Sequence, residues 1–247
     1  MSRADHGRGN NIGSDNHTDT DNHATHDQNL QDMAEMVTKE FWDERYGSAD
    51  AIWSGNPNPR LVEQVADLAP GTALDVGSGE GADAIWLATR GWRVTGIDIS
   101  TVALSRAAER AADAGTQVAD RISWQQADLL SWDEPAGSQG AGNRFDLVSA
   151  HFMHLPRPAV ESVHRALAAA VLPGGTLLIV GHHPADLQTS MGRPSFHDMF
   201  YTAEEIAATL DPDEWQVMVA AAPQRQATDP EGRLVTIQDA VLKAVRS

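Results

Sequence analysis

The chain of 247 residues has 18 Lys and Arg against 35 Asp and Glu, giving a formal net charge of −17, and it contains no cysteine. The lack of cysteine excludes disulfide scaffolds, thiolate zinc sites, iron–sulfur clusters and cysteine nucleophiles. The acidity argues against nucleic acid and anionic membranes as partners, because both are bound through clustered Lys and Arg. With no apolar run near the roughly 18–20 residues that span a bilayer and no evident secretory signal, we expect a cytoplasmic protein.

The first thirty residues differ in composition from the rest of the chain. They hold five Asp, five Asn and four of the ten His, but only five apolar residues, and they carry −3 of the charge. Such a segment cannot bury enough apolar surface to offset the entropy of ordering. We therefore expect residues 1–30 to be a disordered polar tail, although their histidines are also of the kind that chelates metals in His-rich tracts. Residues 31–247 should form one domain.

Two helices are predicted before the first strand. Apolar residues at helical spacing place one over residues 32–46, and a loop rich in Gly, Asn and Pro follows it. A second, short amphipathic helix is predicted from Leu61 to Leu68 and should end at Pro70.

Strands then alternate with helices. Three helices are predicted between the strands. The first begins near Gly81, the second runs from a cap at Ser100 to about Ala114, and the third covers residues 160–171. Helical crossovers of ten or more residues imply parallel strands with right-handed connections. The five apolar runs that predict these strands are 72–76, 92–97, 121–125, 145–150 and 176–180.

The last part of the chain has a different pattern. Thr202 and Glu205 have the spacing of a capping box, which predicts a helix to about Leu210. Residues 215–220 and 235–245 are predicted strands joined by a turn-rich stretch, as in a hairpin. The expected fold is α/β, a single doubly wound sheet of seven strands, mostly parallel with a C-terminal antiparallel hairpin, and helices on both faces.

A glycine-rich loop, DVGSGEG, runs from Asp75 to Gly81 at the end of the first predicted strand. A strand, a glycine loop and a helix together place backbone amides and a positive helix end at the edge where α/β sheets bind ligands. The loop also fits the dinucleotide fingerprint, with Asp98 standing 21 residues after Gly77 as a ribose-binding acid. A carboxylate at position 75 would repel a pyrophosphate but would attract a cationic ligand.

With this acidic residue, the loop resembles motif I (D/E-x-G-x-G-x-G) of class I methyltransferases that depend on S-adenosyl-L-methionine (SAM). Further matching motifs follow in the expected order over Phe41 to Arg246. The resemblance implies a Rossmann-like fold, with a dinucleotide enzyme or a degenerate binder as the alternative. The matching motifs are Ala127-Asp128-Leu129, Phe145-Asp146-Leu147-Val148 and Leu172-Pro173-Gly174-Gly175.

The resemblance implies a role for each cofactor-site residue. Asp75 would attract the ammonium group of SAM, and Asp98 would accept from both ribose hydroxyls, since a carboxylate has two acceptor oxygens. Asp128 would accept from the adenine amine, with Leu129 in the same motif. For Asp75 and Asp128, helix capping or solvation is the alternative. The remaining implied contacts are Gly77, Ser78 and Gly79 under the amino-acid part, Ile99 on the adenine face and Ala150 beside the methyl group.

The segment before the first strand resembles the lead-in of the tellurite-resistance and thiopurine methyltransferase group, which folds over the cofactor. Trp42, Tyr46 and Trp53 are candidate lid residues, because aromatic side chains exclude water and contact a sulfonium by cation–π interaction. The alternative is that they are core aromatics. In the same group a C-terminal hairpin carries a His-Arg pair near the substrate. Arg225 and Arg233 match the arginines, but no His is present, which weakens the case for oxyanion methylation.

Four histidines follow two neighbouring predicted strands, His151 and His154 after the fourth, His182 and His183 after the fifth. A histidine there is a candidate general base or metal ligand. We expect no metal, because no acid has a recognisable ligand spacing. His151 is the candidate catalytic base, and His154 and Arg225 are candidate substrate-binding residues, with solvated side chains as the alternative for each.

These features predict a methyltransferase that uses SAM as cofactor and a small molecule as methyl acceptor, by in-line displacement. The partners would then include no nucleic acid and no membrane, and we expect a monomer or homodimer. A protein or nucleic-acid methyltransferase is opposed by the charge of −14 on the domain. A SAM-binding protein without turnover has the same motifs and stays open.

Overall fold

The computed structural model describes residues 34–49, 51–131, 144–153, 155–191 and 199–247. The tail predicted for residues 1–30 and the candidate residue His154 lie outside these ranges. Among the described residues, no helix is both long and apolar enough to cross a membrane.

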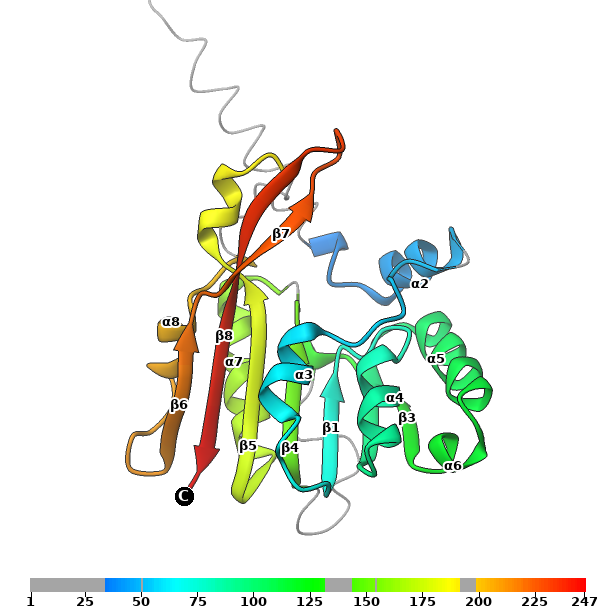
Figure 1. The fold of residues 1–247 in the computed structure, drawn as a ribbon, viewed down its shortest axis with the longest axis horizontal. Coiled ribbons are helices and arrows are strands. Elements are labelled where there is room, and N and C mark those ends of the chain that lie inside the picture. Colours follow the sequence, from blue (N-terminus) through cyan, green and yellow to red (C-terminus); the bar gives the residue numbers. More distant parts are fainter. Residues whose placement is uncertain (1–33, 50, 132–143, 154, 192–198) are drawn as a thin grey trace, which may run out of the picture.

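A single sheet of eight strands forms the centre of the molecule (Figure 1). Its order is β3-β2-β1-β4-β5-β8-β6, and β7 pairs only with β8. The pairs from β3 to β5 are parallel, whereas β8 runs antiparallel to β5, β6 and β7. The strands are β1 (Thr72–Val76), β2 (Arg93–Asp98), β3 (Ile122–Gln126), β4 (Phe145–His151), β5 (Val171–His182), β6 (Trp215–Ala221), β7 (Gln224–Thr228) and β8 (Leu234–Arg246).

Helices cover both faces of the sheet and bury two apolar clusters. One cluster packs α7 and α8 against the sheet through residues such as Leu167 and Ile206. The other packs α3 and α4 against the opposite face through Leu61 and Leu87. The helices are α2 (Lys39–Gly47), α3 (Pro59–Val65), α4 (Ala82–Thr89), α5 (Thr101–Asp113), α6 (Thr116–Ala119), α7 (Arg157–Ala169) and α8 (Ala203–Ala207), with 3-10 turns η1 (Leu129–Ser131) and η2 (Pro184–Gln188).

The predicted helix caps are present. The Ser100 hydroxyl accepts from the amide of Ala103 at the start of α5. Thr202 and Glu205 form the reciprocal capping box of α8, each side chain accepting from the other residue's backbone amide. These interactions satisfy amides that have no partner within the helix, which explains why the helices begin there.

The sheet has eight strands, not the seven predicted from sequence. The turn that was expected to join β6 to β8 instead joins β8 to an additional strand, β7, whose composition QRQAT is polar. Because β8 is 13 residues long, it pairs with β6 along its C-terminal part and with β7 along its N-terminal part. The hairpin of β7 and β8 extends beyond the sheet edge at which β1 and β4 end (Figure 1).

Two element boundaries were also predicted wrongly. The first predicted helix is interrupted, and α2 begins only at Lys39, because the Thr38 hydroxyl caps it by accepting from the Phe41 amide at 3.2 Å. Val171 has helical spacing in the sequence but pairs with Phe145 and begins β5. Its position shows that apolar periodicity alone does not separate the end of a helix from the start of a buried strand.

Candidate active site

The candidate site lies where the chain order of the parallel strands reverses. Strand β1 has β2 on one side and β4 on the other, so the carboxyl ends of these three strands lie next to one another. In doubly wound sheets this switch point is where ligands bind. The glycine loop follows β1, and Asp98 and His151 are the last residues of β2 and β4.

The glycine loop is bonded to the end of β2. The amides of Gly77 and Ser78 both donate to the Ile97 carbonyl at 2.9 Å, and the amide of Gly79 donates to Oδ2 of Asp98 at 2.9 Å. Gly77 and Gly79 have φ angles of +69° and +52°, a region that favours glycine over residues with a side chain. The conformation of the loop is thus fixed by hydrogen bonds to Ile97 and Asp98 at the end of β2.

Asp98 has one hydrogen bond to each carboxylate oxygen. Oδ2 accepts from Gly79 and Oδ1 accepts from the amide of Ser100, both at 2.9 Å. Each oxygen keeps a further lone pair for a ligand hydroxyl. Burial raises the pKa of Asp98 above its usual value, while its backbone hydrogen bonds act in the opposite direction. The contact of Asp98 with the ribose stays a prediction. Asp98 does lie at the carboxyl edge of the sheet, where ligands bind.

Asp75 is buried on the face of the sheet that α3 and α4 cover, with 2% of its surface exposed. Its Oδ1 accepts a long bond of 3.4 Å from the Ser149 hydroxyl, and its Oδ2 has no hydrogen-bond partner among the described residues. Burial, together with the neighbouring carboxylate of Asp83, raises the pKa of Asp75 to about 7. A buried carboxylate in this state is stabilised in its ionised form by a cation.

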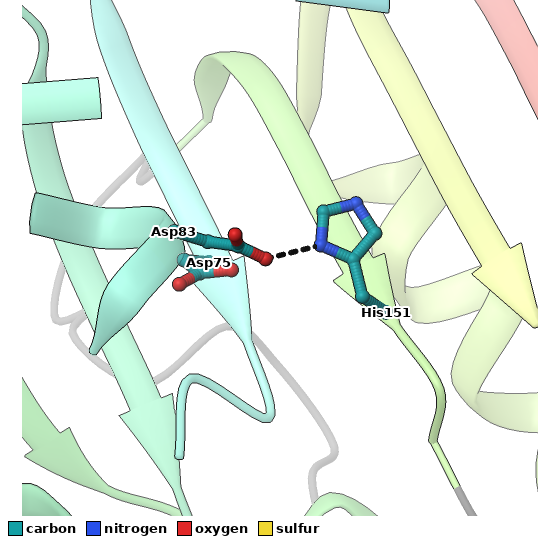
Figure 2. Close-up of side chains that lie close together, drawn as sticks. All are labelled: Asp75, Asp83 and His151. Carbon is teal, nitrogen blue, oxygen red and sulfur yellow. Dashed lines mark hydrogen bonds and ion pairs between the residues drawn. The ribbon is translucent and has the colours of Figure 1, made fainter. Parts of the chain in front are cut away.

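Asp83 and His151 form a close pair beside Asp75. Oδ2 of Asp83 lies 2.7 Å from Nδ1 of His151, and Oδ1 of Asp83 accepts from the backbone amide of Asn58 at 2.6 Å. Figure 2 shows the three side chains together, Asp75 from β1, Asp83 from α4 and His151 from β4. Nε2 of His151 is buried and has no partner among the described residues. Burial lowers the pKa of His151, but Asp83 and Asp75 outweigh it, so the net direction is upward.

The same cluster is the one to consider for a metal. Oxygen and nitrogen atoms of Asp75, Asp83 and His151 lie within 4.8 Å of one another. We assign no metal, because the hydrogen bond between Asp83 and His151 already uses one such atom from each. The metal site considered from sequence consisted of His151, His154, His182 and His183. It included neither Asp75 nor Asp83.

Two aromatic residues cover the glycine loop. The indole Nε1 of Trp53 donates to the Tyr46 hydroxyl at 3.1 Å, and a Cβ on Gly79 would lie 2.9 Å from that hydroxyl. Tyr46 is buried, whereas Trp53 is 47% exposed. The exposure of Trp53 is compatible with the predicted lid role. Tyr46 packs like a core aromatic, which was the alternative, and it also borders the glycine loop.

Glu80 links the segment around Trp53 to helix α5. Its buried carboxylate accepts from the amides of Ile52 and Trp53, both at 3.3 Å. The same carboxylate forms ion pairs with Arg106 at 3.2 Å and Arg110 at 3.3 Å. The segment around Trp53 is therefore attached to the glycine loop itself.

Trp42 and Asp43 attach α2 to its surroundings. The Trp42 indole donates to the Met36 carbonyl at 2.8 Å, and its ring lies 5.9 Å from that of Tyr46. Oδ1 of Asp43 accepts from the Ser100 hydroxyl at 2.7 Å and from the Val102 amide at 3.3 Å. Trp42 thus supports Tyr46.

The other predicted cofactor contacts are placed as follows. Ile99 is half-buried directly after Asp98, and Leu129 begins the turn η1 after β3. Asp128 accepts from the Leu130 amide at 2.9 Å, which is the local capping that was its alternative role. The side chain of Ala150 is fully buried in the core on the α7 side, away from the face that carries Asp75.

His182, the last residue of β5, contacts Phe152, the residue directly after β4. Phe152 has a φ of +52°, the single positive value among described residues other than glycine. Its ring stacks on His182 with centroids 4.4 Å apart, and Phe200 lies 6.1 Å from His182. His183 caps η2 by accepting from the Ala185 amide. On α7, His164 is buried, and burial lowers its pKa to about 4.

Arg225 lies on β7 in an ion-pair cluster. Its Nε contacts both oxygens of buried Asp239, at 3.0 and 3.1 Å, and Arg60 contacts the same carboxylate at 3.1 Å. Arg233 pairs with Asp229 at 2.7 Å. Both arginines matched to the hairpin motif are thus engaged with carboxylates of this chain.

Asp83 and Glu80 were not predicted from sequence as site residues. Glu80 belongs to the glycine loop, and its partner Arg106 lies 26 residues further along the chain. Asp83 follows the loop closely, and its partner His151 lies 68 residues away. Acidic residues are common in the first turn of a helix, because the positive helix end stabilises them. The position of Asp83 in the sequence therefore did not mark it as a site residue. Only the sheet order places β4, and with it His151, beside the start of α4.

The chain contains a domain that matches a known family and resembles several enzymes. A family model described as a methyltransferase domain matches residues 73–175, from β1 into β5. A 2-heptyl-1-hydroxyquinolin-4(1H)-one methyltransferase of Mycobacteroides abscessus is 28% identical over 157 residues, which are 62% of this chain and 65% of that protein. A ubiquinone biosynthesis O-methyltransferase of Alkalilimnicola ehrlichii is 34% identical over 167 residues, 65% of this chain and 62% of that protein. The chain thus spans less than two thirds of the length of these relatives.

The fold also matches solved structures. The structure of TehB from Haemophilus influenzae superposes with a TM-score of 0.60 at 18% identity, covering 85% of this chain and 67% of that chain. At this identity the likeness concerns the fold alone. Together with the sheet order, it supports the class I, Rossmann-like methyltransferase fold predicted from the motifs.

Proposed function

We propose that the chain transfers the methyl group of SAM to a small-molecule acceptor, because residues 73–175 match the model of a methyltransferase domain. This activity belongs to enzyme class 2.1.1. We propose residues 31–247 as the domain that carries it. The low coverage of the relatives makes both the activity and the acceptor matters for experiment.

The observation that carries the proposal is the buried carboxylate of Asp75 beside the glycine loop. Its Oδ2 lacks a partner among the described residues, and a Cβ on Gly77 would meet only Met153, at 3.9 Å. An unpaired buried carboxylate next to open backbone favours a ligand with a positive charge over a phosphate. SAM carries an ammonium and a sulfonium group and no phosphate, so the residues present fit it.

The residues that would hold the cofactor follow from their places around the loop. Gly77, Ser78 and Gly79 would contact its amino-acid part, and Asp98 has lone pairs left for the ribose hydroxyls. Ile99, Asp128 and Leu129 follow the ends of β2 and β3, on the side proposed for the adenine ring.

When bound, SAM supplies a methyl group on a sulfonium that leaves readily, so the protein's contribution is mainly orientation and exclusion of water. In this proposal Trp53 and Tyr46 exclude water from the loop, which their mutual hydrogen bond supports, and Trp42 stabilises Tyr46 by a ring contact. His151 is the proposed general base for an acceptor that must lose a proton.

The relatives' names support a small-molecule acceptor, since one is named a methyltransferase of a hydroxyquinolinone and the other an O-methyltransferase of ubiquinone biosynthesis. The charge of −14 on residues 31–247 supports an acceptor other than nucleic acid. An oxyanion acceptor bound by Arg225 has less support, because Asp239 already pairs with this arginine.

The test combines calorimetry with turnover. We expect the purified full chain to bind SAM, and labelled methyl from SAM to appear in at least one compound of a panel of phenols, thiols, amines and chalcogen oxyanions. Binding without any labelled product would favour a SAM-binding protein without turnover. Absence of binding would contradict the proposal.

A further inference from the structure

Asp83 has two hydrogen bonds that fix its carboxylate. One oxygen accepts from the Asn58 amide at 2.6 Å, and the other lies 2.7 Å from Nδ1 of His151. The carboxylate is therefore held by the backbone on one side and directed at a histidine on the other. This is the relationship in which a carboxylate sets the orientation and proton position of a catalytic histidine.

The pair determines which nitrogen of His151 is free. A carboxylate can only accept, so in the neutral ring the proton resides on Nδ1 and the lone pair on Nε2. Nε2 is buried and has no partner among the described residues. The ring thus lies at the end of β4, beside the proposed cofactor site, and its second nitrogen points away from Asp83 (Figure 2).

We propose that Asp83 is the positioning residue of a dyad in which Nε2 of His151 takes the proton from a hydroxyl of the acceptor. In this step the acceptor O–H bond breaks and its proton goes to Nε2. The oxygen lone pair forms the bond to the methyl carbon, while the carbon–sulfur bond breaks and its electron pair stays on sulfur. Asp83 stabilises the resulting imidazolium, which then returns its proton to solvent.

This inference rests on the proposed function and narrows the acceptor to compounds whose hydroxyl must be deprotonated. A thiolate or another soft anion needs no base, so a buried and oriented histidine has no use for it. The titratable groups acting on His151 are Asp83 on α4 and Asp75 on β1, and both raise its pKa. The base form of His151 is therefore populated only at higher pH than for an ordinary histidine.

The test compares Asp83→Asn with the wild type on two probes of equal shape, 2-naphthol and 2-naphthalenethiol. Because general-base catalysis contributes typically about 10²–10⁴-fold, kcat for the naphthol should fall about 100-fold, with KM for SAM nearly unchanged. The rate with the thiol should stay within about twofold. The acidic limb of the pH–rate profile should move to lower pH, because the asparagine no longer raises the pKa of His151.

A second readout does not depend on turnover. In ¹⁵N spectra of histidine-labelled full chain, we expect the wild-type His151 ring to be protonated at Nδ1, and we expect its pKa to fall in Asp83→Asn. Asp113→Asn, an exposed substitution on α5, is the matched control and should change neither readout. Thermal unfolding establishes that each variant is folded.

The outcomes separate this inference from the proposed function. Failure of the wild type to bind SAM, or to methylate any compound of the wider panel, overturns the proposed function. If wild type and Asp83→Asn methylate the naphthol at equal rates and with the same acidic limb of the pH–rate profile, the dyad is overturned. The proposed methyltransferase activity is unaffected by that result. Equal losses with naphthol and thiol also overturn it, because they would assign Asp83 a structural role only.

Discussion

The Tyr46 hydroxyl accepts a hydrogen bond from the indole of Trp53 at 3.1 Å, beside Gly79 of the glycine loop. A residue from the helix before the sheet and a residue from the following loop are thereby joined over the proposed cofactor site. This contact and the residues around it lead to four predictions.

Removing the Tyr46 hydroxyl should loosen the lid. Tyr46→Phe keeps the ring but deletes the acceptor for Trp53, and a hydrogen bond contributes about 1 kcal/mol, so SAM affinity should fall roughly fivefold. Trp53→Phe, which deletes the donor, should give a similar loss by calorimetry. The double variant should be no weaker than either single one, and a fully additive loss would contradict the shared contact.

Asp98→Ala should weaken SAM binding at least tenfold, which corresponds to about 1.4 kcal/mol. The substitution removes the acceptors for Gly79 and Ser100 together with the proposed ribose contact. Isothermal calorimetry measures the loss, and Asp113→Ala serves as an exposed control. An unchanged dissociation constant would remove Asp98 from the site.

Glu80→Gln should destabilise the fold more than it affects chemistry. The buried carboxylate faces both Arg106 and Arg110, and breaking a buried ion pair costs about 3 kcal/mol because it leaves charge without compensation. Chemical denaturation should show this loss in unfolding free energy. Glu109→Gln on the same helix is exposed and should stay within about 0.5 kcal/mol of the wild type.

SAM affinity should increase with pH through the titration of Asp75. Its pKa is raised to about 7, so below that pH the free protein holds a proton that a cationic ligand must displace. Affinity should therefore fall as pH drops below about 7 and level off above it, and binding at pH 6 should release a proton. Calorimetry in buffers of different ionisation enthalpy measures that release, and Asp75→Asn should abolish it. A flat profile in the wild type would show that Asp75 does not face the cation.

Features that depend on neighbouring residues in the chain were predicted well from sequence. The β1 strand, the glycine loop and the caps at Ser100 and Thr202 each rest on contacts within a few residues, so their residue types reveal them. Strand β7 was missed because its polar composition lacks the apolar alternation of a strand, and it forms only by pairing with β8.

The chemistry of the candidate site was predicted only in part. His151 was identified because it ends a strand at the ligand-binding edge, yet its partner Asp83 could not be, since the two are joined by sheet order and not by spacing. Arg225 shows the reverse case. Its motif suggested an open substrate contact, whereas the pairing of β7 with β8 brings it to Asp239 on β8.

The contacts of residues 52–58 with the start of α4 have one more consequence. The amides of Ile52 and Trp53 bond Glu80, and the amide of Asn58 bonds Asp83. Opening this segment would therefore break hydrogen bonds to two acids, and the bond lost at Asp83 would affect the carboxylate that pairs with His151. Displacement of residues 52–58 and the basicity of His151 are thus coupled in the proposed site.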